Sequence, residues 1–165
     1  MVREIRIFGD PVLRDSAQPV AAVDDELRSL ITDMFETMYA AEGVGLAANQ
    51  IGDLRRVIVV DIREPDQPPL ALVNPELLEV SSELDRLEEG CLSIPGLREV
   101  VERPVRCRAR GLDPQGREAT IAAEGLLARA LQHEIDHLNG VLFLDRVSPL
   151  KRRMLLKKWQ KSRDA

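Results

Sequence analysis

Both histidines of the chain lie in one short segment, His133-Glu134-Ile135-Asp136-His137, and their spacing constrains the fold more than any other feature. Apolar residues around the segment recur with helical period, which predicts a helix over residues 126–138 that ends at Asn139-Gly140. Positions i and i+4 share one face of a helix, so both imidazoles point the same way. Leu131, Ile135 and Leu138 place this helix in the core. Two unpaired imidazoles are costly to desolvate there, and one shared metal ion removes that cost.

Two histidines leave a catalytic metal ion short of protein ligands, since such sites use three protein ligands and one open position. One option for the third ligand is a glutamate on a later helix, but the acids downstream are Asp145 and Asp164. Neither lies on a segment expected to cross the site. The other option is Cys91, in a Gly- and Pro-flanked turn over residues 89–96. Cys107 shares one face of a predicted strand with Val105 and Ala109, and it is expected to be a packing residue.

Periodicity along the rest of the chain predicts an α+β fold, because a helix is followed by several antiparallel strands and then by helices. We expect the strands to pack around the central metal-binding helix, with an N-terminal amphipathic helix and a C-terminal helix. The N-terminal helix is predicted over residues 24–41, and a buried strand over 57–62. Further strands are predicted over residues 70–73, 77–81, 105–112 and 117–123. The last helix opens at Ser148-Pro149, an N-cap residue followed by a proline.

The chain has 165 residues, which fits one domain. Its longest uncharged stretch is residues 43–52, whereas a membrane helix needs about 20 apolar residues. The first residues lack the apolar core of a signal peptide, so we expect a cytoplasmic protein without a membrane partner. Two cysteines in such a protein do not form a disulfide framework.

The net charge of −5 is unevenly distributed. Residues 151–165 carry seven Lys and Arg against one Asp, a net +6, and include all four lysines of the chain. The other 150 residues hold 16 basic and 27 acidic side chains, a net −11. This division predicts one catalytic domain over residues 1–148 and a basic C-terminal helix over residues 149–165.

A glycine-containing run, Gly43-Val44-Gly45-Leu46-Ala47-Ala48-Asn49-Gln50, lies between the first helix and the buried strand. A phosphate-binding loop is one interpretation, but no Lys-Ser/Thr follows the glycines and no strand clearly precedes them. The run has too few polar residues for an ordinary exposed loop.

Three segments in order resemble the three motifs of bacterial peptide deformylases. They are residues 43–50, Glu89-Gly90-Cys91-Leu92-Ser93 and Gln132-His133-Glu134-Ile135-Asp136-His137. One such motif is a weak signal, whereas three in the right order supply all three ligand types. The resemblance spans nearly the whole chain.

The resemblance implies a hydrolase that removes the formyl group from the N-terminal formyl-methionine of new polypeptides. It implies that Cys91, His133 and His137 bind one divalent metal ion, with Fe(II), zinc and nickel as candidates. Glu134 is then the general base, which passes a proton to the leaving amine. By the same resemblance, the side-chain amide of Gln50 and the backbone N–H of Leu92 stabilise the oxyanion.

The same resemblance implies that further residues contact the substrate. They are Gly43, Val44, Gly45, Glu89, Gly90, Arg98, Leu126 and Ala130. Val44, Leu126 and Ala130 are expected to form walls of the methionine pocket, although Leu126 and Ala130 fit a plain core role equally well. Arg129 lies one turn before His133, and its guanidinium is expected to extend outward at the pocket rim.

The basic tail has two interpretations. A terminal helix with cations near its C-terminal end is favoured by the helix dipole alone. The family resemblance implies ribosome docking through this helix, with ribosomal RNA rather than DNA as the partner.

Two other functions compete with deformylation. A metalloprotease would use the same histidine spacing, but Cys91, Gln50 and the missing downstream ligand argue against it. A metal site that only stabilises the fold would have no use for Glu134 beside the open position.

Overall fold

A computed structural model describes residues 1–164, and it has an α+β fold with antiparallel sheets, as predicted. The helices are α1 (Asp25–Ala40), α2 (Gly125–Leu138) and α3 (Pro149–Asp164). The strands are β1 (Gly45–Ala47), β2 (Val57–Val60), β3 (Leu70–Val80), β4 (Leu84–Cys91), β5 (Ile94–Pro104), β6 (Arg106–Leu112) and β7 (Glu118–Glu124). Short 3₁₀ helices cover Pro11–Arg14, Ala48–Ile51 and Phe143–Arg146.

Five strands form the main sheet in the order β1-β2-β3-β6-β7, with antiparallel neighbours throughout. The hairpin β4–β5 forms a separate two-stranded sheet. In sequence the hairpin lies between β3 and β6, and these two strands are neighbours in the main sheet. The chain therefore leaves the main sheet at the end of β3, forms the hairpin, and re-enters the sheet beside β3.

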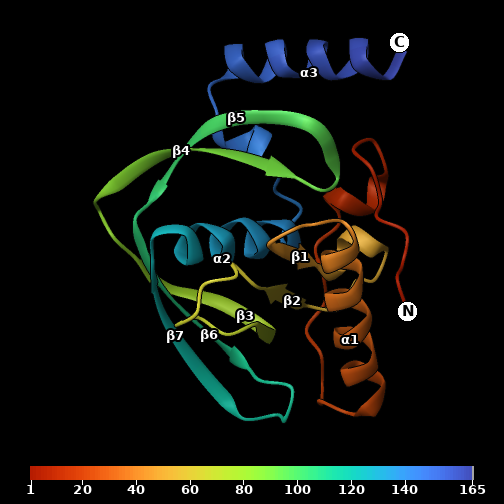
Figure 1. The fold of residues 1–165 in the computed structure, drawn as a ribbon, viewed down its shortest axis with the longest axis vertical. Coiled ribbons are helices and arrows are strands. Elements are labelled where there is room, and N and C mark those ends of the chain that lie inside the picture. Colours follow the sequence, from red (N-terminus) through yellow and green to blue (C-terminus); the bar gives the residue numbers. More distant parts are fainter. Residues whose placement is uncertain (165) are drawn as a thin grey trace.

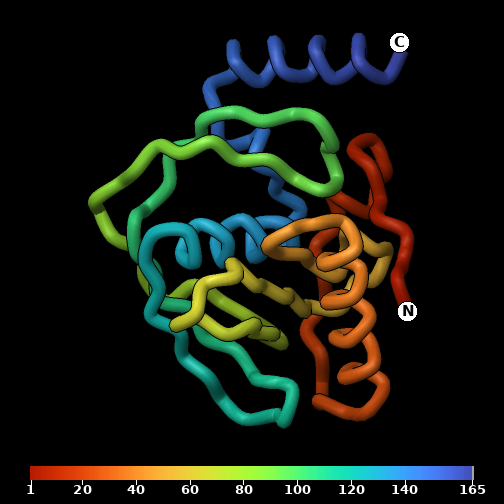
Figure 2. The backbone as a smooth tube through the Cα atoms, viewed as in Figure 1, coloured from red at the N-terminus to blue at the C-terminus, as the bar shows by residue number. Residues whose placement is uncertain are grey.

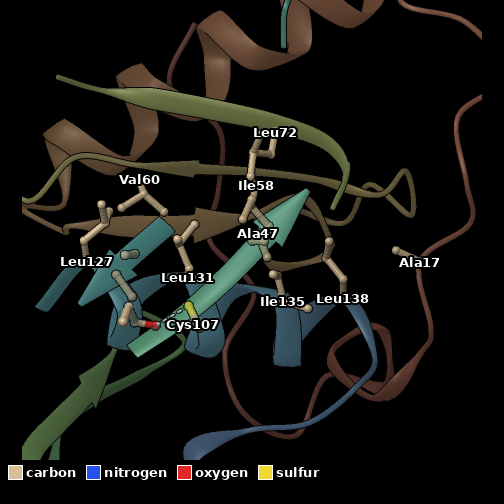
Figure 3. Packing of buried hydrophobic residues seen from close by; sticks show 14 residues of the cluster. Ala17, Ala47, Ile58, Val60, Leu72, Cys107, Leu127, Leu131, Ile135 and Leu138 are labelled. Atoms are coloured by element: carbon tan, nitrogen blue, oxygen red, sulfur yellow. Dashed lines mark hydrogen bonds between the residues drawn. The ribbon is translucent and has the colours of Figure 1, made fainter. Parts of the chain in front are cut away.

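The buried strand β2 explains how the main sheet is covered on both faces. All four of its residues are buried, so its apolar run is continuous instead of alternating. Ile58 and Val60 belong to the cluster that includes Leu131 and Ile135 of α2, which Figure 3 shows. Val57 and Val59 belong to the opposite cluster, which includes α1. The sheet thus lies between α2 and α1.

Helix α1 begins where its N-cap predicts. The side chain of Asp24 accepts a hydrogen bond from the N–H of Leu27 at 2.9 Å, and Asp25 and Glu26 occupy the first turn. The buried residues recur at helical spacing and pack on the sheet; they are Leu27, Leu30, Ile31, Met34, Thr37 and Met38.

Helix α2 runs between the main sheet and the β4–β5 hairpin, and α3 lies across the far side of the hairpin (Figure 1). The same order is visible in the backbone trace (Figure 2). A third cluster joins the hairpin residue Val101 to Phe143 and to Leu155 and Trp159 of α3. The hairpin is thereby held from both sides.

The predicted break between two strands is absent from the structure. Residues 70–73 and 77–81 were expected to be two strands separated at Pro75, but β3 is one strand with a register shift between Val73 and Glu76. Asn74 has a positive φ of 53°, and its side chain bonds the backbone of Val20 at 2.7 and 2.9 Å. These bonds hold a bulge where the sequence predicts a break.

The structure also contains strands that are not predicted, namely β1 and the two strands of the β4–β5 hairpin. The predicted last helix is observed as α3, and residue 165 of its predicted span lies outside the described residues. Among residues 1–164, no helix is long and apolar enough to cross a membrane.

Candidate metal centre

Helix α2 presents both histidines to the hairpin. Leu127, Leu131 and Ile135 occupy the sheet-facing cluster, and His133 and His137 lie on another face of the helix. His133 is 8% exposed and His137 is fully buried, and their Nε2 atoms lie 3.2 Å apart. The helical spacing therefore brings both imidazoles to one point, as predicted from their i and i+4 positions.

Cys91 reaches the same point from the end of β4. A register shift between Gly90 and Cys91 interrupts the hairpin ladder, and Cys91 pairs with Ile94 across the turn. Its Sγ atom lies 3.2 Å from Nε2 of His137. The ligand atoms of Cys91, His133 and His137 all lie within 4.8 Å of one another.

This donor set fits one divalent ion. A thiolate and two imidazoles are ligands that zinc and iron accept, and three protein ligands leave one position open. Burial above all, with a smaller contribution from the neighbouring His133, lowers the pKa of His137 well below its usual value. A neutral imidazole is the form that binds a metal ion.

Glu134 follows His133 on α2, lines the same cavity as His133 and Cys91, and is 4% exposed. Among the described residues its Oε1 atom has no hydrogen-bond partner. Burial raises the pKa of its carboxyl group to about 7. An unpartnered, buried carboxyl group of this kind is suited to exchanging a proton near neutral pH.

Gln50 enters the site from the 3₁₀ helix Ala48–Ile51 and is 2% exposed. Its Oε1 atom accepts a hydrogen bond from the N–H of Ala47 at 2.9 Å. Its Nε2 atom donates to Oγ of Ser93 at 3.1 Å and lies 3.7 Å from Sγ of Cys91. The amide donor is therefore aimed at the ligand cluster.

Glu89 supports the site from behind His133. Its Oε1 atom lies 2.9 Å from Nδ1 of His133, and Arg103 holds the same carboxylate at 2.5 and 3.0 Å. Burial alone would raise the pKa of Glu89, but the bonds from His133 and Arg103 lower it to about 2. Glu89 was predicted to contact substrate; it lines the cavity, and its carboxylate is occupied by these partners.

A cavity of about 700 Å³ opens beside the ligand cluster. The predicted substrate-contacting residues all line it, as do Gln50, Cys91, Leu92, His133 and Glu134. Val44 and Leu126 are 38% and 47% exposed, whereas Ala130 is buried. Nε of Arg98 pairs with Glu88 at 2.7 Å.

Arg129 corrects one expectation. It was expected to extend outward at the pocket rim, but it is 4% exposed. Its Nη1 atom donates to Glu89 at 2.5 Å, and its Nη2 atom donates to Oδ1 of Asp85 at 2.7 Å. Two carboxylates of β4 draw the guanidinium inward, because a buried cation needs such partners.

Sequence reasoning missed Arg103 and the hydroxyl of Ser93 as parts of the site. Arg103 is 4% exposed and follows the buried Val101 at strand spacing. An arginine at an inward-facing position of a strand is a signal for a buried ion pair, but only once the strand has been recognised.

The fold and the site together define a metal-dependent hydrolase: a Cys and two His converge beside a buried glutamate and an open cavity. The family profile described as polypeptide deformylase matches residues 2–153, and the chain belongs to this peptide deformylase family. As a member, it removes the formyl group from the N-terminal formyl-methionine of newly made polypeptides and releases formate.

Several relatives match over most of their length. The peptide deformylase of Cellvibrio japonicus is 49% identical over 96% of this chain and 94% of its own. The crystal structure of the Ehrlichia chaffeensis enzyme is 40% identical, covers 99% of this chain and 98% of its own, and has a TM-score of 0.92. A Synechococcus elongatus enzyme, solved in complex with actinonin, is 46% identical over 94% of this chain and 86% of its own, with a TM-score of 0.89.

Proposed function

We propose that Cys91, His133 and His137 hold one divalent metal ion and that deformylation takes place in the adjoining cavity. The convergence of these three ligand atoms within 4.8 Å supports this proposal more than any other observation. When bound, such an ion supplies a water of lowered pKa and an electrophilic contact for the formyl oxygen. The central metal-binding helix is then α2.

Glu134 is the general base in this proposal. Its buried carboxyl group takes the proton from the attacking water and delivers it to the leaving amine. Its unpartnered Oε1 atom supports the role, because no described side chain competes for the proton.

Gln50 and the backbone N–H of Leu92 stabilise the oxyanion that develops on the formyl oxygen. The hydrogen bonds from Ala47 and to Ser93 fix the Gln50 amide before substrate arrives. One such donor is worth about 10²–10³ in rate.

The substrate lies along the cavity. Val44, Leu126 and Ala130 enclose its methionine side chain, and the peptide backbone passes Gly43, Gly45 and Gly90, which line the same cavity. Arg98 contacts the peptide beyond the methionine. We expect actinonin, the compound bound to the Synechococcus elongatus relative, to compete with formylated peptide for this cavity.

Formate release from formyl-Met-Ala-Ser, after anaerobic purification and metal analysis, tests the proposal. We expect one metal ion per chain, with Fe(II) the ion bound in the cell and zinc or nickel able to replace it. Glu134→Gln keeps the shape of the side chain and should lower kcat by about 10²–10⁴-fold while the metal content stays at one ion. Activity that persists in Glu134→Gln would exclude the assigned base.

Helix α3 is proposed to dock the enzyme on the ribosome, where formylated chains emerge in the cytoplasm. Lys151 pairs with Glu99 at 3.0 Å and Arg152 with Asp145 at 3.4 Å. The remaining cations of α3 are exposed; they are Arg153, Lys157, Lys158, Lys161 and Arg163. This basic helix is then a docking element outside a catalytic domain of residues 1–148.

Co-sedimentation with ribosomes tests the docking proposal. Deletion of residues 151–165 would also remove the buried Leu155 and Trp159. Replacing Arg153, Lys157 and Lys161 with Gln leaves those contacts in place. We expect this variant to lose co-sedimentation, the wild type to lose it as salt rises, and both to turn over free peptide equally. Unchanged co-sedimentation at low salt would overturn the docking role.

A further inference from the structure

The charged side chains behind His133 form a continuous chain of alternating sign. Its members, in order of contact, are Asp85, Arg129, Glu89, Arg103, Asp136 and Arg146. Successive members approach within 2.7, 2.5, 2.5, 3.0 and 2.7 Å. Three carboxylates balance three guanidinium groups. The side chain of Glu89 in the middle is 5% exposed, whereas Asp85 and Arg146 at the ends are 33% and 48% exposed.

The two oxygens of Glu89 have different partners. Oε1 contacts Nδ1 of His133 and Nη2 of Arg103, at 2.9 and 3.0 Å. Oε2 accepts from Nε of Arg103 and Nη1 of Arg129, both at 2.5 Å. Arg129 thus holds the oxygen that His133 does not use, and the carboxylate cannot rotate away from the imidazole without breaking that bond. A carboxylate fixed in this way sets the ring orientation and tautomer of a ligand histidine.

Arg129 also fastens the hairpin to α2. Its Nη1 atom donates to the carbonyl oxygen of Val101 on β5 at 2.9 Å, and its Nη2 atom donates to the carbonyl oxygen of Asp85 on β4 at 3.2 Å. One guanidinium on α2 therefore contacts the backbone of both hairpin strands. The hairpin carries Cys91, and α2 carries His133 and His137.

We propose that Arg129 is a positioning residue of the metal centre. Through Glu89 it fixes the orientation of His133, and through the hairpin backbone it fixes the distance between Cys91 and the two histidines. It touches neither the reacting atoms nor the ion. This inference rests on the metal centre proposed above.

The most direct test removes Arg129 without leaving a buried charge unpaired. In the double variant Arg129→Met/Asp85→Asn, the four remaining members of the ion-pair chain are still neutral in sum. We expect the loaded ion to leave this variant about tenfold faster than the wild type in the presence of a chelator. The visible spectrum of the Co(II)-loaded protein should also change, because it reports the geometry of the ligands. We expect kcat to fall while KM changes little.

Matched controls separate positioning from general packing. Asp85→Asn alone keeps an acceptor oxygen for Arg129, and Arg110→Met makes the same change at an exposed arginine that pairs with Glu76. Both should release the ion at the wild-type rate. Arg129→Lys keeps the charge but cannot make all the hydrogen bonds of the guanidinium. Its ion-release rate should therefore lie between those of the wild type and the double variant. It is measured in parallel and decides the question if the double variant does not accumulate as folded protein.

A purely structural role for Arg129 has a different signature. The variants would then unfold at lower temperature, but the ion-release rate and Co(II) spectrum of the folded protein would match the wild type. That result would overturn the inference. If the wild type itself binds no ion, the proposed metal centre fails, which is a distinguishable outcome.

Discussion

Gly45 leaves no room for a side chain beside Glu134: a Cβ atom at position 45 would lie 2.5 Å from Oε2 of that glutamate. Strand β1 can therefore lie this close to helix α2 only because residue 45 has no side chain. Cβ atoms do not approach other atoms this closely in proteins, so a larger residue must displace the carboxyl group.

Gly45→Ala should therefore lower kcat by about 100-fold, because a displacement of about 1 Å at a catalytic group has an effect of that size. Formate release measures it, and metal content should stay at one ion per chain. Gly43→Ala is the comparison, since its Cβ would meet the flexible end of Leu92 at 2.7 Å. Leu92 can move aside, and we expect a smaller loss there. Equal losses in both variants would contradict the specific contact with Glu134.

Ser93→Ala tests the support of Gln50. Ser93 is fully buried, and its hydroxyl oxygen accepts the hydrogen bond from Nε2 of Gln50 at 3.1 Å. Without it the amide loses one of its fixed partners, and we expect kcat to fall about tenfold with KM nearly unchanged. Steady-state kinetics on formyl-Met-Ala-Ser checks this, with Ser162→Ala on α3 as the control. A kcat equal to that of the wild type would show that Gln50 needs no help from Ser93.

Asp145 should make folding stability depend on pH. Burial alone would raise the pKa of Asp145, but hydrogen bonds from Arg14 at 2.6 Å and from the N–H of Leu142 at 2.9 Å lower it below the usual 3.8. The unfolded chain then takes up the proton first as the pH falls. The stabilisation is complete above about pH 5 and is lost as the pH falls through the folded-state pKa.

Urea unfolding of Asp145→Asn measures this contribution. The variant should be less stable than the wild type by about 1–2 kcal/mol at pH 7. That difference should shrink between about pH 5 and pH 2. Asp66→Asn, at an exposed loop position, is the control and should differ little from the wild type at any pH. A difference that stays constant down to pH 2 would refute the assignment.

Trp159 anchors α3 to the rest of the molecule. It is 6% exposed and meets the ring of Phe8 edge-to-face, with the ring centroids 6.3 Å apart. Trp159→Ala should reduce the free energy of unfolding by about 3–5 kcal/mol. Met154→Ala on the same helix removes a side chain that is 63% exposed and should change it by less than about 0.5 kcal/mol. Similar values for the two variants would show that α3 is held by something other than this contact.

Elements with a clear period could be predicted from the sequence. The apolar spacing located α1 and α2, and the strict alternation around Cys107 located β6. The hairpin β4–β5 could not be found this way, because most residues of β4 are exposed or half-buried and its pattern is charged on both faces. Its position depends on contacts with α2 and α3, which lie later in the chain.

The residues of the site also differ in whether a local sequence pattern predicts their position. His133 and His137 could be paired from local spacing, because a helix fixes their relation within one turn. The inward direction of the Arg129 side chain could not be predicted, since its partners Glu89 and Asp85 lie 40 and 44 positions earlier in the chain. Whether an arginine extends outward or turns inward is decided by such distant carboxylates, which no local pattern reveals.

The hairpin β4–β5 starts and finishes between two paired strands, so its opening would break its contacts with α2 and α3 but none of the strand pairings of the five-stranded sheet. Such sub-global openings occur with a lower free energy than complete unfolding. Amide protons of the hairpin should therefore exchange with solvent faster than those of β2, and each opening would carry Cys91 away from the two histidines. We therefore expect the lifetime of the assembled site to follow how often this hairpin opens, rather than how often the whole protein unfolds.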